Sequence, residues 1–179
     1  MAVLSITYAP HPIFRQKSAL VPQVDDGVRA LIDHMYDTLY HEDAIGLSAP
    51  MVGVALRVAI VDIREGGERT PLTLVNPEIL GQSEEMQTHN EASLSYPFIS
   101  ADVTRPAAID VRFQDREGVT QTLRAEGFLA TVIQHEMEYF EGRCFLDHLS
   151  RMKRDMLMKK MQKLLKHNPP HVHGEHCQH

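Results

Sequence analysis

Residues 134–139 read Gln134-His135-Glu136-Met137-Glu138-Tyr139 and are the most informative stretch of the chain. They match the metal-binding pattern H-E-x-x-H at its first two positions, but a tyrosine stands where the second histidine is expected. In the intact pattern, two histidines four residues apart share one helix face and bind the metal, and the glutamate remains free as a general base. The stretch therefore raises the question of whether metal chemistry has been kept, changed or lost.

Length and composition indicate one domain with a polar tail. The chain has 179 residues, 43% of them hydrophobic, which suffices for one sizeable core. We expect a single domain over residues 1–167 and a histidine-rich, disordered tail over residues 168–179. No run of about 18 apolar residues spans a bilayer, and residues 1–10 lack the basic flank of a signal peptide, so we expect a cytoplasmic protein without a membrane partner.

The cysteine count and the net charge argue against two further classes of protein, namely disulfide-stabilised proteins and general nucleic-acid-binding proteins. With only Cys144 and Cys177, the chain does not have the cysteines of a disulfide framework, which fits a reducing compartment. The formal net charge is -6, which argues against general nucleic-acid binding. We therefore expect no sequence-specific nucleic-acid partner.

Hydrophobic spacing predicts a mixture of helices and strands. Apolar residues from Val24 to Leu39 recur at helical spacing and begin beside an acidic pair, which predicts a first helix of about 16 residues. The last two strand-like runs are separated by a glycine turn and predict a hairpin. Residues 127–140 are apolar on nearly every side, so their helix should be buried. The strand-like runs are residues 56–63, 72–75, 86–95, 108–114 and 119–125.

A basic amphipathic helix is predicted near the C-terminus. Its apolar residues recur every three or four positions and should pack one face on the body of the protein. Its basic residues form either a solvated surface or a docking element for an anionic surface such as ribosomal RNA. The apolar residues are Leu149, Met152, Met156, Leu157, Met161, Leu164 and Leu165, and the basic ones are Arg151, Lys153, Arg154, Lys159, Lys160, Lys163 and Lys166.

The buried helix carries charged residues that need partners. An unpaired charge in a dry interior costs several kcal/mol, so His135, Glu136 and Glu138 should each meet a hydrogen-bonding or charged group. Taken alone, His135 fits a structural hydrogen-bonded histidine as well as a metal ligand. Glu136 fits a general base as well as a structural acceptor.

Three segments together resemble the signature motifs of the peptide deformylase family, usually written G-x-G-L-A-A-x-Q, E-G-C-L-S and Q-H-E-x-D-H. They are residues 46–51 (Gly-Leu-Ser-Ala-Pro-Met), 91–95 (Glu-Ala-Ser-Leu-Ser) and 134–139. The likeness runs from about Val3 to Leu165 and includes the stretch 103–106 and the basic terminal helix. It implies an α+β fold, in which antiparallel sheets surround a central helix carrying the third motif, with N-terminal and C-terminal helices.

The resemblance also implies a reaction and a cofactor. In the family, a cysteine and two histidines bind a divalent metal, iron or zinc, and a metal-bound water attacks the formyl group of a formyl-methionyl nascent peptide. Carried over to this chain, the metal positions are Ser93, His135 and Tyr139. The general base is Glu136, the oxyanion glutamine is replaced by Met51, and the oxyanion amide belongs to Leu94. Gly46, Leu47 and Glu91 belong to the substrate groove.

The replacements predict weak or absent deformylase activity. Ser93 offers a neutral hydroxyl in place of a thiolate, and Tyr139 could bind only as a phenolate, with a free pKa of about 10. A four-ligand metal site of this type has a binding free energy of roughly 10 to 16 kcal/mol. Losing two strong ligands therefore removes on the order of 5 to 8 kcal/mol of metal-binding free energy. Met51 cannot donate a hydrogen bond to the oxyanion, which costs about a hundredfold or more in rate.

Three hypotheses of function remain open. The first is a non-catalytic member that still recognises a formyl-methionyl or methionyl N-terminus. The second is an active hydrolase whose rearranged ligands are His135, Tyr139 and either Glu136 or Glu138. The third is a metal-binding protein that acts through its tail, since histidine-rich tracts bind zinc, nickel or copper. The candidate tail ligands are His171, His173, His176, Cys177 and His179.

Overall fold

The computed structural model describes residues 2–170. Its α-helices are α1 (Asp26–His41), α2 (Gly127–Glu138) and α3 (Arg151–His167), and its strands are β1 (Gly46–Ser48), β2 (Val58–Val61), β3 (Leu72–Gln82), β4 (Met86–Ser93), β5 (Tyr96–Pro106), β6 (Ala108–Gln114) and β7 (Thr120–Glu126). Short 3-10 helices cover Pro12–Arg15, Ala49–Val52, Glu65–Gly67, Tyr139–Glu141 and Phe145–His148. The five candidate ligands of the tail lie outside the described residues.

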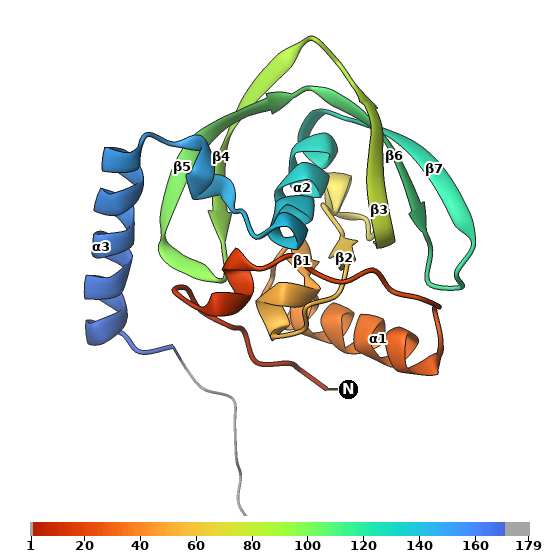
Figure 1. Ribbon diagram of the computed structural model, residues 1–179, viewed down its shortest axis with the longest axis horizontal. Coiled ribbons are helices and arrows are strands. Elements are labelled where there is room, and N and C mark those ends of the chain that lie inside the picture. Colours follow the sequence, from red (N-terminus) through yellow and green to blue (C-terminus); the bar gives the residue numbers. More distant parts are fainter. Residues whose placement is uncertain (1, 171–179) are drawn as a thin grey trace, which may run out of the picture.

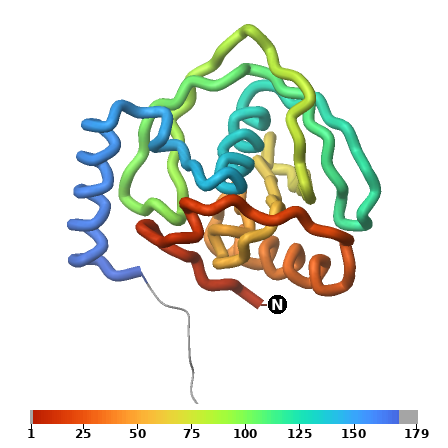
Figure 2. Tube along the Cα trace, in the orientation of Figure 1, coloured from red at the N-terminus to blue at the C-terminus, as the bar shows by residue number. Residues whose placement is uncertain are grey.

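Two antiparallel sheets enclose the central helix α2 (Figure 1). One sheet has the strand order β1-β2-β3-β6-β7, and the other pairs β4 with β5. Figure 2 shows how the chain passes over the top of α2 between β3 and β4, and returns between β5 and β6. The α+β fold expected from the sequence is confirmed.

Helix α1 forms where its sequence pattern predicted it. The side chain of Asp25 accepts a hydrogen bond from the backbone N–H of Val28, which caps the first turn. Ile32, Met35 and Leu39 recur at helical spacing and are fully buried, so α1 packs one apolar face on the core. The predicted β6–β7 hairpin is also present, with Ala108 opposite Glu126 and Gln114 opposite Thr120.

Strands β1 and β5 were not predicted. The predicted run 86–95 continued as a strand through the turn at Leu94 and Ser95, where the chain reverses into β5. Prolines at both ends of β5 hid the strand, because proline cannot donate to a ladder in a central strand. The two-stranded sheet tolerates them, since each of its strands has an edge without a ladder partner in the described structure.

Helix α3 packs on β5 through a narrower stripe than the sequence predicted (Figure 1). Leu157 and Met161 are buried, but Met152 is 83% exposed and Met156 is 59% exposed. Their assignment to the packed face was wrong, because α3 lies outside a small two-stranded sheet that covers only one side of it. Within residues 2–170, no helix is long and apolar enough to cross a membrane.

Candidate functional site

Strand β4 brings two motif residues to the face of α2. Glu91 is buried and Ser93 is half-buried, two positions further along the same face of the strand. The β4–β5 register shifts between Ala92 and Ser93. Such an irregularity bends a strand and re-aims its side chains.

Helix α2 supplies the third motif from the centre of the molecule. His135 and Glu136 are both buried, and Tyr139 opens the 3-10 helix that continues α2. His135 and Tyr139 are four residues apart and therefore share one side of the helix. Their rings contact edge to face, with centroids 5.8 Å apart.

Ser93 and Tyr139 meet through their hydroxyl groups. The Oγ of Ser93 and the OH of Tyr139 lie 2.7 Å apart, and the backbone N–H of Ser95 donates to the same Oγ at 3.2 Å. The Tyr139 ring is fully buried and packs against Phe14 at a centroid distance of 5.6 Å. Burial and the nearby Glu136 carboxylate raise the pKa of Tyr139 well above its usual value. Its phenol therefore stays protonated at neutral pH.

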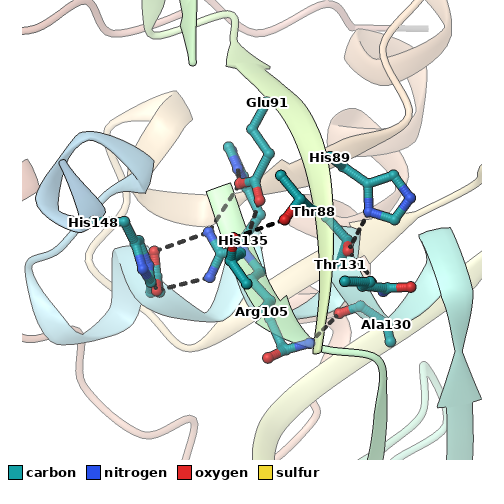
Figure 3. A network of polar contacts seen from close by, with 12 residues as sticks. Thr88, His89, Glu91, Arg105, Ala130, Thr131, His135 and His148 are labelled. Atoms are coloured by element: carbon teal, nitrogen blue, oxygen red, sulfur yellow. Dashed lines mark hydrogen bonds and ion pairs between the residues drawn. The ribbon is translucent and has the colours of Figure 1, made fainter. Parts of the chain in front are cut away.

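A buried ion-pair network orients His135 (Figure 3). The Nδ1 of His135 lies 2.7 Å from Oε1 of Glu91, and Arg105 donates to Glu91 through Nε at 2.7 Å and through a terminal nitrogen at 2.9 Å. Burial alone would raise the pKa of Glu91, but Arg105 and His135 lower it to about 2. The charged Glu91 thereby fixes the imidazole with its Nδ1 toward β4.

The same arginine also binds Glu138. Arg105 donates to the two oxygens of Glu138 at 2.8 and 3.2 Å, and Nε2 of His148 lies 2.5 Å from one of them. Both Glu138 oxygens are therefore engaged by Arg105, which argues against a ligand set that uses Glu138. Within residues 2–170, no group of three His, Cys, Asp or Glu side chains is arranged to hold a metal ion.

Glu136 is a buried carboxyl group that forms no ion pair among the described residues. Its side chain packs so closely on Gly46 that a Cβ there would lie 2.6 Å from Oε1, which explains why glycine occupies this position. Its Oε2 has no hydrogen-bond partner of good geometry among the described residues, although the neighbouring Ser48 side chain acts to lower the pKa of Glu136. Burial raises the pKa of Glu136 to about 7, although the charge of His135 opposes the shift. A carboxyl group with such a pKa can gain or lose a proton near neutrality.

A pocket of about 650 Å³ opens onto these residues. Gly46, Met51, Glu91, Ser93, Leu94, His135 and Glu136 line it. Leu47 does not: its side chain is fully buried in the core. Tyr139 is also fully buried and is not among the lining residues. The pocket therefore joins most of the motif positions predicted from the sequence.

The sequence motifs gave no role to Arg105, although this residue links Glu91 and Glu138 in the ion-pair network. Residues 99, 101, 103 and 105 of β5 alternate with exposed ones and are buried, so Arg105 occupies an inward-facing position. A buried arginine requires acidic partners. The alternation becomes informative only when residues 96–106 are known to form a strand, which the sequence pattern did not predict.

The sequence pattern of the family described as "Polypeptide deformylase" matches residues 3–155. The chain belongs to the peptide deformylase family. A peptide deformylase-like protein of Rickettsia conorii is 50% identical over 174 residues, which cover 97% of this chain and 95% of that protein. A peptide deformylase of Zymomonas mobilis is 47% identical over 168 residues, which cover 91% of this chain and 95% of that protein.

Solved structures agree with the family and with the fold. The peptide deformylase of Ehrlichia chaffeensis aligns with a TM-score of 0.89 at 32% identity, covering 93% of this chain and 98% of that one. The same enzyme solved in complex with actinonin aligns with a TM-score of 0.88 at 34% identity, covering 92% and 98%. The family is metal-dependent and acts on formyl-methionyl nascent peptides.

Proposed function

We propose that this chain is a non-catalytic or weakly active member of the peptide deformylase family that binds the N-terminal end of a peptide. The observation that carries the proposal is the 2.7 Å contact between the hydroxyls of Ser93 and Tyr139. These side chains occupy two of the three metal positions of the family. Each hydroxyl is the hydrogen-bond partner of the other, as expected of two neutral groups that need no metal ion.

The residues at the three metal positions do not fit iron or zinc. A protonated serine and a protonated tyrosine are weak neutral donors, whereas these metals are bound in proteins by thiolate, imidazole and carboxylate. The elevated pKa of Tyr139 opposes formation of the phenolate that a metal would require. His135 alone retains the donor type of the family. No catalytic step is therefore assigned to a metal at these positions.

The oxyanion position supports the same proposal. Met51 is buried and lines the pocket where the family has a glutamine. Its thioether is only a weak acceptor and cannot donate a hydrogen bond to a developing oxyanion. Glu136 keeps its place and a pKa near 7. A general base without an activated water and without the side-chain oxyanion donor cannot sustain family-level hydrolysis.

The pocket itself supports retained peptide binding. Strand β1 is the outermost strand of its sheet in the described structure, so one of its edges has no ladder partner. Ile45 and Gly46 bring this edge to the pocket. An extended peptide can add to such an edge through backbone hydrogen bonds, while the pocket takes a side chain. The proposed partner is accordingly the N-terminus of a nascent or released peptide in the cytoplasm.

Two further assignments rest on the sequence. The basic residues of α3 favour docking to an anionic surface such as the ribosome, and Met152 and Met156 are exposed on the same helix. The tail candidates, which lie outside the described residues, favour metal binding at the C-terminus. Neither assignment requires the pocket.

Turnover of a formylated peptide tests the proposal. A variant that ends at His167 is incubated anaerobically with ferrous iron and formyl-Met-Ala-Ser, and release of formate is followed. We expect no turnover above that of a His135→Ala variant, because two ligand positions and the side-chain oxyanion donor are replaced. Metal-dependent turnover that Glu136→Gln abolishes would show instead that a rearranged site is active.

A further inference from the structure

We propose that a second pocket, on a different face of α2 from the pocket described above, binds a small organic carboxylate with an apolar body. The second pocket has a volume of about 350 Å³, and it shares no lining residue with the first. Three arginines line it, Arg57, Arg105 and Arg143, and it is called the arginine pocket below. The proposal requires neither peptide binding nor a metal at the family positions.

The arginine pocket lies between strand β3 and the C-terminal end of α2. The α2 residues that line it are Gln134, Met137 and Glu138, whereas those that line the first pocket are Thr131, Val132, His135 and Glu136. At 3.6 residues per turn, the two sets occupy different faces of the helix. Strand β3 contributes residues 77–79, and its register with β6 shifts on both sides of residues 78–79. The strand therefore bends where it borders the arginine pocket.

The carboxylates of the arginine pocket are already paired. Each of its three glutamates forms an ion pair with an arginine, at a nitrogen–oxygen distance of 2.7 or 2.8 Å; the pairs are Glu78–Arg112, Glu138–Arg105 and Glu141–Arg57. Arg112 does not line the pocket, so one lining arginine is left over. This is Arg143, whose side chain forms no ion pair or hydrogen bond within residues 2–170. The unpaired charge that lines the pocket is therefore positive, and it favours an anionic ligand.

The lining arginines have hydrogen-bond donors to spare. A guanidinium group has five N–H donors. Arg57 contacts the Ser18 carbonyl through Nε and Glu141 through Nη1, and Arg105 forms four bonds to its two glutamates. N–H groups remain on both, and these pairs already hold the two side chains in place, which lowers the entropic cost of binding. A carboxylate can accept two parallel N–H bonds from one guanidinium, which makes it the matching ligand group.

Apolar side chains form the remaining walls of the arginine pocket. Ile79 lines it from β3, Met137 from α2, and Phe140, which is 1% exposed, from the 3-10 helix after α2. A volume of about 350 Å³ is at the lower end of the range for small-molecule sites, so the pocket has room for a single ring or a short chain. An apolar body would also exclude water from the ion pair and strengthen it. These walls favour an organic acid over an inorganic anion.

Nuclear magnetic resonance titration of the full chain, labelled with ¹⁵N, tests the inference. The probes are benzoate, its neutral isostere benzamide, and inorganic phosphate. We expect benzoate to cause saturable shifts at the backbone amides of residues 137–143, with a Kd on the order of 1 mM. Benzamide and phosphate should each bind at least about tenfold more weakly, because the first lacks the charge and the second lacks the apolar body. Arg143→Gln should weaken benzoate binding by about fivefold or more.

Arg151→Gln is the matched control, because Arg151 has a side chain that is 89% exposed on α3 and does not line the arginine pocket. It should leave the affinity for benzoate unchanged. The inference would be overturned by equal binding of benzamide or phosphate, by benzoate shifts confined to the first pocket, or by no saturable shift below about 20 mM. These comparisons use the unmodified chain, so they do not depend on how a variant folds. An unchanged affinity in Arg143→Gln would also overturn it, and none of these results bears on the proposed function.

Discussion

Restoring the family's residues with Ser93→Cys, Tyr139→His and Met51→Gln should raise turnover of formyl-Met-Ala-Ser by at least about a thousandfold. The glutamine alone accounts for about a hundredfold through the oxyanion. The thiolate and the second imidazole replace two neutral hydroxyls and should increase metal affinity by about four to six decades. Formate release after anaerobic loading with ferrous iron measures the gain.

Two controls separate restored chemistry from general effects of substitution. Adding Glu136→Gln to the triple variant should abolish the gain, because the general base is then absent. Tyr139→His alone should destabilise the fold, since it empties space that the buried ring fills beside Phe14. A folded triple variant that binds iron and yet gains no activity would contradict our account of these positions.

Arg105→Met is expected to lower the free energy of unfolding by about 3 to 5 kcal/mol. Arg105 is 3% exposed and bonds to Glu91 and Glu138, which would both be left without their main counterion. Chemical denaturation of the variant and the parent chain measures the loss. Arg112→Met is the matched control: Arg112 pairs with Glu78 on the surface, with both side chains at least half exposed, and its loss should cost about 1 kcal/mol or less.

The network also predicts how stability depends on pH. The pKa of Glu91 is held at about 2 in the fold, below its ordinary value of 4.5. Its contribution to stability is therefore fully present above about pH 4.5 and is lost as the pH falls toward 2. Arg105→Met should flatten this part of the profile. The network would be shown not to stabilise the fold if Arg105→Met left the pH dependence of stability below about pH 4.5 unchanged and lowered the free energy of unfolding by less than about 1 kcal/mol.

Elements with strong local patterns could be predicted from the sequence. Helix α1 has its cap and its periodic apolar face within 17 residues, and the β6–β7 hairpin has a glycine turn between two strand-like runs. Strand β5 could not be predicted in this way, because its prolines are tolerated only in the two-stranded sheet to which it belongs. The exposure of Met152 depends likewise on how little of α3 that sheet covers.

In the candidate site, too, some features could be predicted from the sequence and others could not. The three motifs identified the positions of Ser93, His135 and Glu136, because these positions depend on residue type and spacing. Pairing could not be deduced, since it depends on contacts between different elements: Arg105 approaches Glu91 from the neighbouring strand β5, and Tyr139 approaches Ser93 from the end of α2. The sequence indicated that each buried charge needs a partner. The structure supplies one to His135 and Glu138, and leaves Oε2 of Glu136 without one among the described residues.

Zinc titration of a variant that ends at His167, followed by calorimetry, tests most directly whether the three family metal positions still hold a metal. Removing the tail excludes its histidines from the measurement. We predict no binding at micromolar zinc beyond that of the same variant carrying His135→Ala, because the hydroxyls of Ser93 and Tyr139 stay protonated and bonded to each other. Stoichiometric binding that His135→Ala abolishes would contradict the account, since it would place a metal at the positions that we describe as unsuited to one.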